Sequence, residues 1–384
     1  MKVSDFDYDL PPEFIAQSPA SPRDSSRLLH LDRATGRIGH FRFNDIARLL
    51  NPKDVLVMNN TRVIPARLAA RKAATGGKVE ILLLRRLTAT RWKALIRGRN
   101  IREGLRLEID KGSISCQCIR GLGRGQHVIE FDQAIDERLQ GLGEIPLPPY
   151  IQSRSAAANR SVLLTQKCKP FRSLSDAVYI NNTLEESEKY QTVYSAVDGS
   201  AAAPTAGLHF TPELMTNLQN FGVKLAYCTL HIGLDTFQPV AVDEVSDHVI
   251  HSEFASLDAE AAGIINGAIA SGQRVIAVGT TSARTLESAA RARNRDENTI
   301  QDPNSFDSGK TLVAPMSGDT DLFIVPGFNW RVVDAMITNF HLPRSTLLMM
   351  LSAFAGREAI LDAYEIAKEE AYRFYSFGDA MFVT

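Results

Sequence analysis

The stretch R-V-I-A-V-G-T-T-S-A-R-T-L-E-S-A-A-R-A-R at 274–293 decides the main fold of this chain. Its first residues form a short apolar run, which is typical of a buried strand, and Gly279 follows as a turn residue. The residues from Ala283 onward favour a helix. A strand that turns directly into a helix is the repeating unit of α/β proteins, so the stretch predicts an α/β domain.

Further strands and helices of the same kind lie on both sides of this stretch. Thr211-Pro212-Glu213 begins a helix with a cap, a proline and an acid in their preferred places, and Gly222 can end it. Asp258 caps another helix, which ends at Gly272. Residues 294–320 are polar, and we expect a loop there. We also predict strands at 55–60, 223–232 and 332–340, and a pair of helices at 345–355 and 358–374.

The segment between about 63 and 148 contains only β patterns. Short strands are predicted at 79–86, 92–97, 105–110 and 127–131, with glycine-rich turns between them. G-L-G-R-G at 121–125 precedes a strand, so it is a hairpin turn and not a dinucleotide loop. The sequence therefore predicts an α/β main domain, 1–62 plus 149–384, with an inserted small all-β, barrel-like domain at 63–148.

The composition is that of an ordinary globular protein. Of 384 residues 44% are hydrophobic and 23% are charged, which excludes a disordered chain and a fibrous repeat. The most apolar run, 346–356, is too short to span a bilayer, and the acidic N-terminal residues do not resemble a signal peptide. We therefore expect a cytoplasmic protein with no membrane partner. The four cysteines are expected to be small buried hydrophobes.

The net charge of −1 hides a strong asymmetry along the chain. Residues 62–124 contain 16 Lys or Arg and 4 Asp or Glu, a net charge of +12, which points to a polyanionic partner. In R-W-K-A-L-I-R-G-R at 91–99, strand alternation places the cations on one face above an apolar underside. We expect this face, made of Arg91, Lys93, Arg97 and Arg99, to bind nucleic acid.

Two features of the α/β part suggest a binding or catalytic site. Free N–H groups and hydroxyls at the Gly279–Ser282 turn can bind an anion or a ribose, although Thr281 or Ser282 can also simply cap the helix. Five of the eight histidines lie between residues 209 and 341 of this part. D-H-V-I-H-S-E at 247–253 has the look of metal spacing, but no cysteine supports it, so we expect no metal. No nucleophile motif is present.

Several long and unusual strings occur along the chain. They are N-N-T-R-V-I-P-A-R-L at 59–68, Y-Q-T-V-Y-S at 190–195, A-A-P-T-A-G-L-H-F-T at 202–211, T-L-H-I-G-L-D-T-F-Q-P-V at 229–240, D-H-V-I-H-S-E at 247–253, V-I-A-V-G-T-T-S-A-R-T-L-E-S at 275–288, T-N-F-H-L-P-R-S-T-L-L at 338–348 and Y-R-F-Y-S-F-G-D-A-M at 372–381. With these strings the chain resembles, from about residue 3 to the end, the S-adenosylmethionine:tRNA ribosyltransferase-isomerases of queuosine biosynthesis.

The resemblance implies a transfer reaction on tRNA. The family isomerises the ribosyl part of S-adenosylmethionine and attaches it to 7-aminomethyl-7-deazaguanine at the wobble position of tRNAs for aspartate, asparagine, histidine and tyrosine. The product is epoxyqueuosine, and adenine and methionine are released. S-adenosylmethionine is then a co-substrate, no cofactor or metal is bound, and a monomer is expected.

This chemistry requires a general base and a proton donor for adenine, but no covalent nucleophile. As the base we rank His209 and His231 first and His251 with Glu253 second. His341 ranks third, as a substrate-binding residue. Within the matching strings we expect substrate contacts from Thr205, Thr280, Thr281, Ser282, Arg284, Asn339 and His341.

Two departures from the family pattern are visible. Asp235 stands where the family usually has glycine, and the segment 152–188 is longer than usual. Two other kinds of protein also remain open. An RNA methyltransferase would release S-adenosylhomocysteine instead of adenine. A non-catalytic RNA-binding protein would leave the polar clusters at the strand ends without a role.

Overall fold

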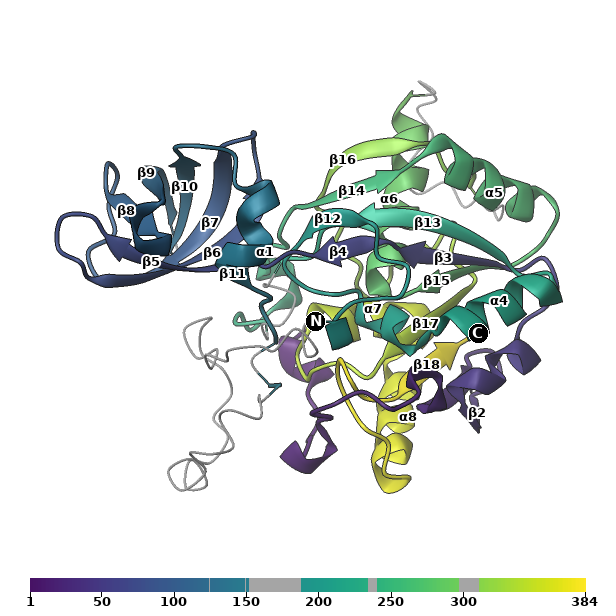
Figure 1. The fold of residues 1–384 in the computed structure, drawn as a ribbon. Helices are drawn as coiled ribbons and strands as arrows, with labels where there is room; N and C mark the ends of the chain where they lie inside the picture. Colours follow the sequence, from purple (N-terminus) through teal and green to yellow (C-terminus); the bar gives the residue numbers. More distant parts are fainter. Residues whose placement is uncertain (124, 149, 152–187, 234–239, 297–310) are drawn as a thin grey trace.

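The computed structural model describes residues 1–123, 125–148, 150–151, 188–233, 240–296 and 311–384. Asp235 and nearly all of the 152–188 segment lie outside these residues. The described chain forms a closed antiparallel barrel beside a large mixed sheet with helices (Figure 1). The class of the fold, mixed α/β with a barrel, is as expected from the sequence. The division into a main domain and an insert stays a prediction.

The large sheet has nine strands in the order β16-β14-β13-β3-β15-β17-β18-β1-β2. Its central strands β13, β3, β15 and β17 are parallel, and antiparallel strands extend both edges. The bounds are β1 Arg27–Asp32, β2 Arg37–Arg42, β3 Val55–Asn59, β13 Lys224–Leu230, β14 Glu253–Leu257, β15 Val275–Val278, β16 Met316–Thr320, β17 Ala335–Asn339 and β18 Ala380–Val383.

At the centre of this sheet, in β3, β15 and β17, both faces are buried, as these continuous apolar strands require. Val55 and Val57 of β3 point into one hydrophobic core, whereas Leu56 and Met58 point into a second core on the opposite face. The α-helices that accompany the sheet are α4 Pro212–Phe221, α5 Ala259–Ala270, α6 Thr280–Asp296, α7 Thr346–Ala355 and α8 Arg357–Glu369. Short 3-10 helices are Val3–Phe6, Pro12–Phe14, Arg23–Ser25, Phe43–Leu49, Asp110–Gly112, Asp136–Arg138, Thr205–His209 and Val245–Asp247.

The barrel is a ring of six antiparallel strands, β5-β6-β7-β10-β9-β8, closed by pairing of β8 with β5. It encloses a separate hydrophobic core, to which Trp92, Ala94 and Ile96 contribute. A two-stranded sheet of β4 and β12 lies between the barrel and the large sheet (Figure 1). The bounds are β4 Thr61–Val63, β5 Arg67–Lys72, β6 Lys78–Arg86, β7 Arg91–Arg97, β8 Arg106–Ile109, β9 Ile114–Gly123, β10 Gln126–Phe131, α1 Leu139–Leu142, β11 Gly143–Glu144 and β12 Val197–Ser200.

Local sequence signals explain most helix ends. The Thr211 hydroxyl accepts the Leu214 N–H at 3.1 Å, and Gly222 ends α4 with a left-handed φ of 104°. Asp258 caps α5 by accepting the Ala261 N–H at 2.8 Å. The expected hairpin turn joins β9 to β10. Cys116, Cys118 and Cys228 are buried free thiols, as expected, and Cys168 lies outside the described residues.

Three expectations about the chain are wrong. Helix α6 begins at Thr280 and not at 283, because Gly279 alone, with φ of 88°, makes the turn after β15. Neither Thr281 nor Ser282 acts as its cap: the Thr281 hydroxyl accepts from the Asn59 amide, and the Ser282 hydroxyl donates to the Val278 carbonyl. The polar segment 294–320 ends in a strand, β16, whose alternating exposure fits the edge of a sheet.

Gly378 makes a tight turn before β18. A Cβ there would lie 2.4 Å from the Arg373 carbonyl oxygen, which is main chain and cannot rotate away. We expect Gly378→Ala to lower the free energy of unfolding by about 1–3 kcal/mol, measured by urea denaturation. Gly267→Ala in α5 is the matched control, since a Cβ there meets open space and should stabilise the helix by about 0.5–1 kcal/mol. Equal effects of the two changes would contradict the prediction.

Candidate active site

A cleft of about 1340 Å³ lies between the barrel and the large sheet. Its barrel side is basic. Its other side is formed by the end of β13 and by the first residues of β14 and α6. The carboxyl ends of parallel strands are where open α/β sheets hold their ligands. The basic side is lined by Arg85, Arg86, Lys93 and Arg97, and the polar floor by His231, Gly233, His251, Glu253, Thr280, Thr281 and Arg284.

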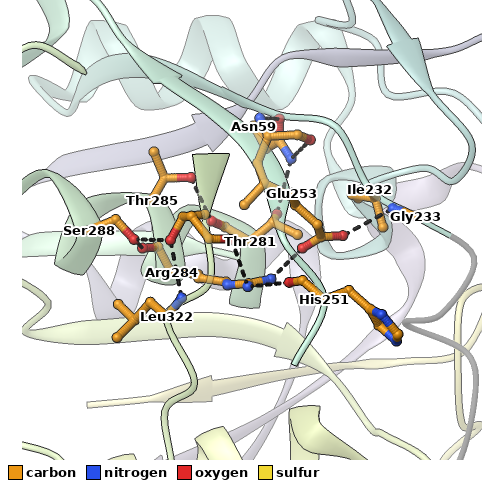
Figure 2. A network of polar contacts seen from close by, with 12 residues as sticks. Asn59, Ile232, Gly233, His251, Glu253, Thr281, Arg284, Thr285, Ser288 and Leu322 are labelled. Atoms are coloured by element: carbon orange, nitrogen blue, oxygen red, sulfur yellow. Dashed lines mark hydrogen bonds and ion pairs between the residues drawn. The ribbon is translucent and has the colours of Figure 1, made fainter. Parts of the chain in front are cut away.

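A buried ion pair between Arg284 of α6 and Glu253 of β14 forms the floor of the cleft (Figure 2). The two side chains are only 9% and 11% exposed. The other Glu253 oxygen accepts the Gly233 N–H at 3.0 Å, and Arg284 Nη2 donates to the carbonyls of His251 at 2.9 Å and Thr320 at 3.1 Å. Burial lowers the pKa of Arg284, which nevertheless stays a cation beside Glu253. The pair thus joins four segments of chain at one point.

His251 contributes to this network through its main chain. Its carbonyl oxygen accepts from Arg284, while its imidazole points away from the ion pair (Figure 2). The residue is exposed and lines the cleft. His251 and Glu253 therefore lie at the same cleft, and the predicted pairing of a base with an orienting carboxylate stays a prediction.

His231 follows β13 directly and also lines the cleft. Its Nδ1 is 2.8 Å from the Thr61 hydroxyl, and its ring stacks on Phe254 with centroids 5.6 Å apart. Burial, with the charge of Arg85 as a smaller cause, lowers the pKa of His231, so the ring is neutral at pH 7. No hydrogen bond to its Nε2 occurs among the described residues, which leaves that atom for a ligand.

The start of α6 presents Thr280 and Thr281 to the cleft, but not Ser282. The Ser282 side chain is fully buried and bonded to the Val278 carbonyl. Thr281 is fixed by the Asn59 amide, which donates to its hydroxyl at 3.1 Å. Two of the three predicted hydroxyl residues therefore stand where a helix N-terminus attracts an anion.

Besides Ser282, four predicted substrate-binding or catalytic residues lie outside the cleft. The ring of His209 is buried, with Nδ1 2.8 Å from the Ser26 hydroxyl and Nε2 accepting from Asn339 at 3.1 Å. Asn339 in turn accepts from Thr205 at 3.2 Å. His341 is bonded to Thr338 at 2.8 Å. Burial lowers the pKa of His209 to about 4 and that of His341 to about 3. These contacts favour structural roles for the four residues. Of the two histidines ranked first as the base, only His231 lines the cleft.

The barrel cations alternate as the sequence predicts over β7. Arg91, Lys93 and Arg97 point outward, whereas Arg99 lies beyond the end of the strand. Arg91 is paired with Glu130 of β10 at 2.9 Å, so its charge is partly compensated. Lys93 and Arg97 line the cleft and extend its basic side.

Comparison with known proteins identifies the family. The family described as queuosine biosynthesis protein matches residues 3–383. The chain belongs to this family. An S-adenosylmethionine:tRNA ribosyltransferase-isomerase from Acetivibrio thermocellus is 46% identical over 386 residues, which cover 100% of both chains. The crystal structure of an S-adenosylmethionine tRNA ribosyltransferase from Thermotoga maritima is 35% identical, with a TM-score of 0.51 over 99% of this chain and 100% of that one.

This queuosine biosynthesis protein is therefore an enzyme, both a transferase and an isomerase. Among the described residues, no cluster of three or more His, Cys, Asp or Glu side chains is arranged to hold a metal. No helix in the described part of the chain is long and apolar enough to cross a membrane.

Sequence reasoning missed three residues of the site in this queuosine biosynthesis enzyme. Thr61 bonds to the ring of His231, a Cβ at Gly199 would clash with that ring, and Asn59 bonds to Thr281. Asn59 and Thr61 belong to the matching string N-N-T-R-V, whose run of short polar residues directly after a buried strand is the signal that would have found them. Gly199 carries no such signal.

Proposed function

We propose that the enzyme transfers and isomerises the ribosyl group of S-adenosylmethionine onto 7-aminomethyl-7-deazaguanine at the wobble position of tRNA, with epoxyqueuosine as product and adenine and methionine released. The observation that supports this best is the cleft, which joins a basic wall to a polar floor. A polyanion on one side and a small sulfonium nucleoside on the other are the two substrates that this reaction needs. The relatives' names agree with that pair.

The residues of the cleft suit this chemistry. A sulfonium acidifies the adjacent C5′ of the ribose, so a base can remove a proton there and the electrons can expel adenine. The aminomethyl nitrogen then attacks the sugar, and loss of methionine closes the epoxide. His231, and His251 near Glu253, are the candidates for acid–base roles because they reach the cleft. The methionine carboxylate would be held at the start of α6, beside Thr280 and Thr281.

The tRNA is proposed to lie across the barrel face that carries Lys93 and Arg97, with its wobble base entering the cleft. The acceptors would be the tRNAs for aspartate, asparagine, histidine and tyrosine. S-adenosylmethionine would act as a co-substrate without a bound cofactor or metal. We further propose that the enzyme works as a monomer in the cytoplasm.

Reversing the charge of Lys93 and Arg97 to glutamate should weaken tRNA binding and reduce its salt dependence. Each lost phosphate contact lowers the slope of log K against log salt by about 1, because fewer counterions are released. Binding isotherms at several salt concentrations measure this slope, and affinity for S-adenosylmethionine should remain. The control is Arg48→Glu with Lys53→Glu, which makes the same change of charge in the segment that precedes β3. An unchanged slope in the barrel variant would contradict the prediction.

Product analysis tests the reaction itself. The enzyme is incubated with S-adenosylmethionine and a tRNA that carries the aminomethyl base, and small molecules and digested tRNA are analysed by mass spectrometry. Release of adenine and methionine with a matching gain of mass on the base supports ribosyl transfer. S-adenosylhomocysteine would instead indicate methyl transfer, and tRNA binding without turnover would indicate a binding protein.

A further inference from the structure

Thr61 is the hydrogen-bond partner of the His231 ring within the protein. The side chain of Thr61 is fully buried, and its hydroxyl lies 2.8 Å from His231 Nδ1. Among the described residues this is the only hydrogen bond of that hydroxyl. With one partner, the hydroxyl either donates to Nδ1 or accepts from it. If it accepted, its own proton would be buried without a partner, which costs about 1–3 kcal/mol. Nδ1 therefore accepts, and the proton of the neutral ring is on Nε2.

The orientation of the ring is fixed as well. Phe254 stacks on it with an interplanar angle of 21°. Gly199 approaches it closely, and a Cβ at that position would lie 2.8 Å from ring atoms Cε1 and Nε2. The φ of Gly199 is +144°, which L side chains rarely adopt. A ring flip would exchange Nδ1 with Cδ2 and break the hydrogen bond to Thr61, and the contacts with Phe254 and Gly199 hinder that rotation.

The main-chain support of Thr61 makes this arrangement rigid. The Thr61 N–H donates to the Asn59 side-chain oxygen at 3.1 Å, and the same oxygen accepts the Leu230 N–H at 3.0 Å. The Asn59 amide also donates to the Leu230 carbonyl at 3.0 Å and to Thr281. Asn59 thus holds both Leu230, the residue before His231, and Thr61. It also bonds to Thr281 of α6 (Figure 2).

We propose that His231 acts as a neutral hydrogen-bond donor to the substrate through its Nε2–H, and that Thr61 is the positioning residue that fixes this tautomer. The inference rests on the proposed function. The acceptor is the purine of the co-substrate, which gains negative charge when its bond to the ribose breaks and the electron pair moves onto the ring. His231 keeps its proton; the proton that adenine finally takes is the one that the base removed from C5′. A neutral imidazole can stabilise charge in this way, as it does in other enzymes.

A pair of substitutions separates this role from that of a base. His231→Gln places an amide N–H near the position of Nε2 but cannot accept a proton, whereas His231→Ala supplies neither group. Adenine release is measured at saturating tRNA. We expect His231→Ala to be slower than the native enzyme by about 10²–10³-fold and His231→Gln to recover at least about tenfold of that loss. Equal rates for the two variants, or a His231→Ala enzyme as fast as the native one, would overturn the proposal.

The tautomer itself can be observed in the native enzyme without any reaction. With ¹⁵N-labelled histidine, two-bond ¹H–¹⁵N spectra distinguish a protonated Nε2 from a protonated Nδ1, and the signals absent from His231→Gln identify the residue. We expect the Nε2–H form, its loss in Thr61→Val, and its return in Thr61→Ser. An Nδ1–H form in the native enzyme, or an unchanged spectrum in Thr61→Val, would refute the role of Thr61.

Failure of the proposed function would be recognised separately. If the native enzyme releases no adenine from S-adenosylmethionine, the reaction is wrong, whatever the tautomer of His231. If the native enzyme releases adenine but the glutamine and alanine variants are equally slow, the reaction stands and the donor role falls.

Discussion

Replacing His251 by alanine should slow adenine release by a factor of about 10²–10⁴, the usual contribution of a general base. His251 is exposed in the cleft, its main chain is held by Arg284, and its ring points away from the buried ion pair. Of the histidines ranked as bases, His209 is enclosed and His231 is proposed to keep its proton, so His251 is the candidate to accept one. The rate is measured in single turnovers, together with exchange of the C5′ hydrogens of S-adenosylmethionine into heavy water.

A base variant should lose both turnover and exchange while still binding tRNA. His40→Ala is the control, because this histidine lies on β2 at the far edge of the large sheet, where it contacts Tyr372. If His251→Ala keeps more than about a tenth of the rate, His251 is not the base; if every histidine variant keeps that much, the base is a carboxylate, with Glu253 as the next candidate.

Breaking the Arg284–Glu253 pair should cost the enzyme about 3–5 kcal/mol of folding free energy, because Glu253→Gln leaves a buried guanidinium without its counterion. Both side chains are almost fully buried, so water cannot compensate the charge. The glutamine can still accept the Gly233 N–H, so the effect comes mainly from the lost charge. Urea denaturation at pH 7 gives the change in free energy.

The barrel offers a matched control for this change. Glu130→Gln breaks the ion pair with Arg91, whose side chains are 35% and 50% exposed, and should cost at most about 1 kcal/mol. A second variant, Glu253→Gln with Arg284→Met, removes both charges and should recover part of the lost stability. Similar costs for the buried and the exposed pair would show that Arg284 is solvated in the folded enzyme.

Local signals in the sequence were sufficient for several elements of the α/β part and of the barrel. The apolar run before Gly279, the caps of α4 and α5 and the alternation in β7 each depend on residues a few positions apart, and the structure agrees with them. The strand β16 was missed because its alternation only makes sense beside β14, which is about 60 residues earlier in the chain.

The site was harder to predict because its order depends on distant contacts. His209 and His231 look alike in sequence: each lies in a matching string, near a glycine. What separates them is Ser26 and Asn339 around one ring and Thr61 and Gly199 around the other, all from remote segments. The partners of Arg284 were also invisible, since Glu253 lies 31 positions before it. Resemblance to a family identified the strings but not which side chains face the cleft.

The order of strands in the large sheet also has a consequence for biosynthesis. The hairpin of β1 and β2 is joined to the rest of the sheet only through β18, which pairs with β1 on one side and with β17 on the other. Among the described strands, β1 and β2 are synthesised first, but they can join the large sheet only after β18, the last strand, has been synthesised. While translation continues, the barrel has all its strands and can close, but the hairpin has an unpaired edge, a state that favours aggregation. A nascent chain that stalls before Ala380 would hold a finished barrel beside an incomplete sheet.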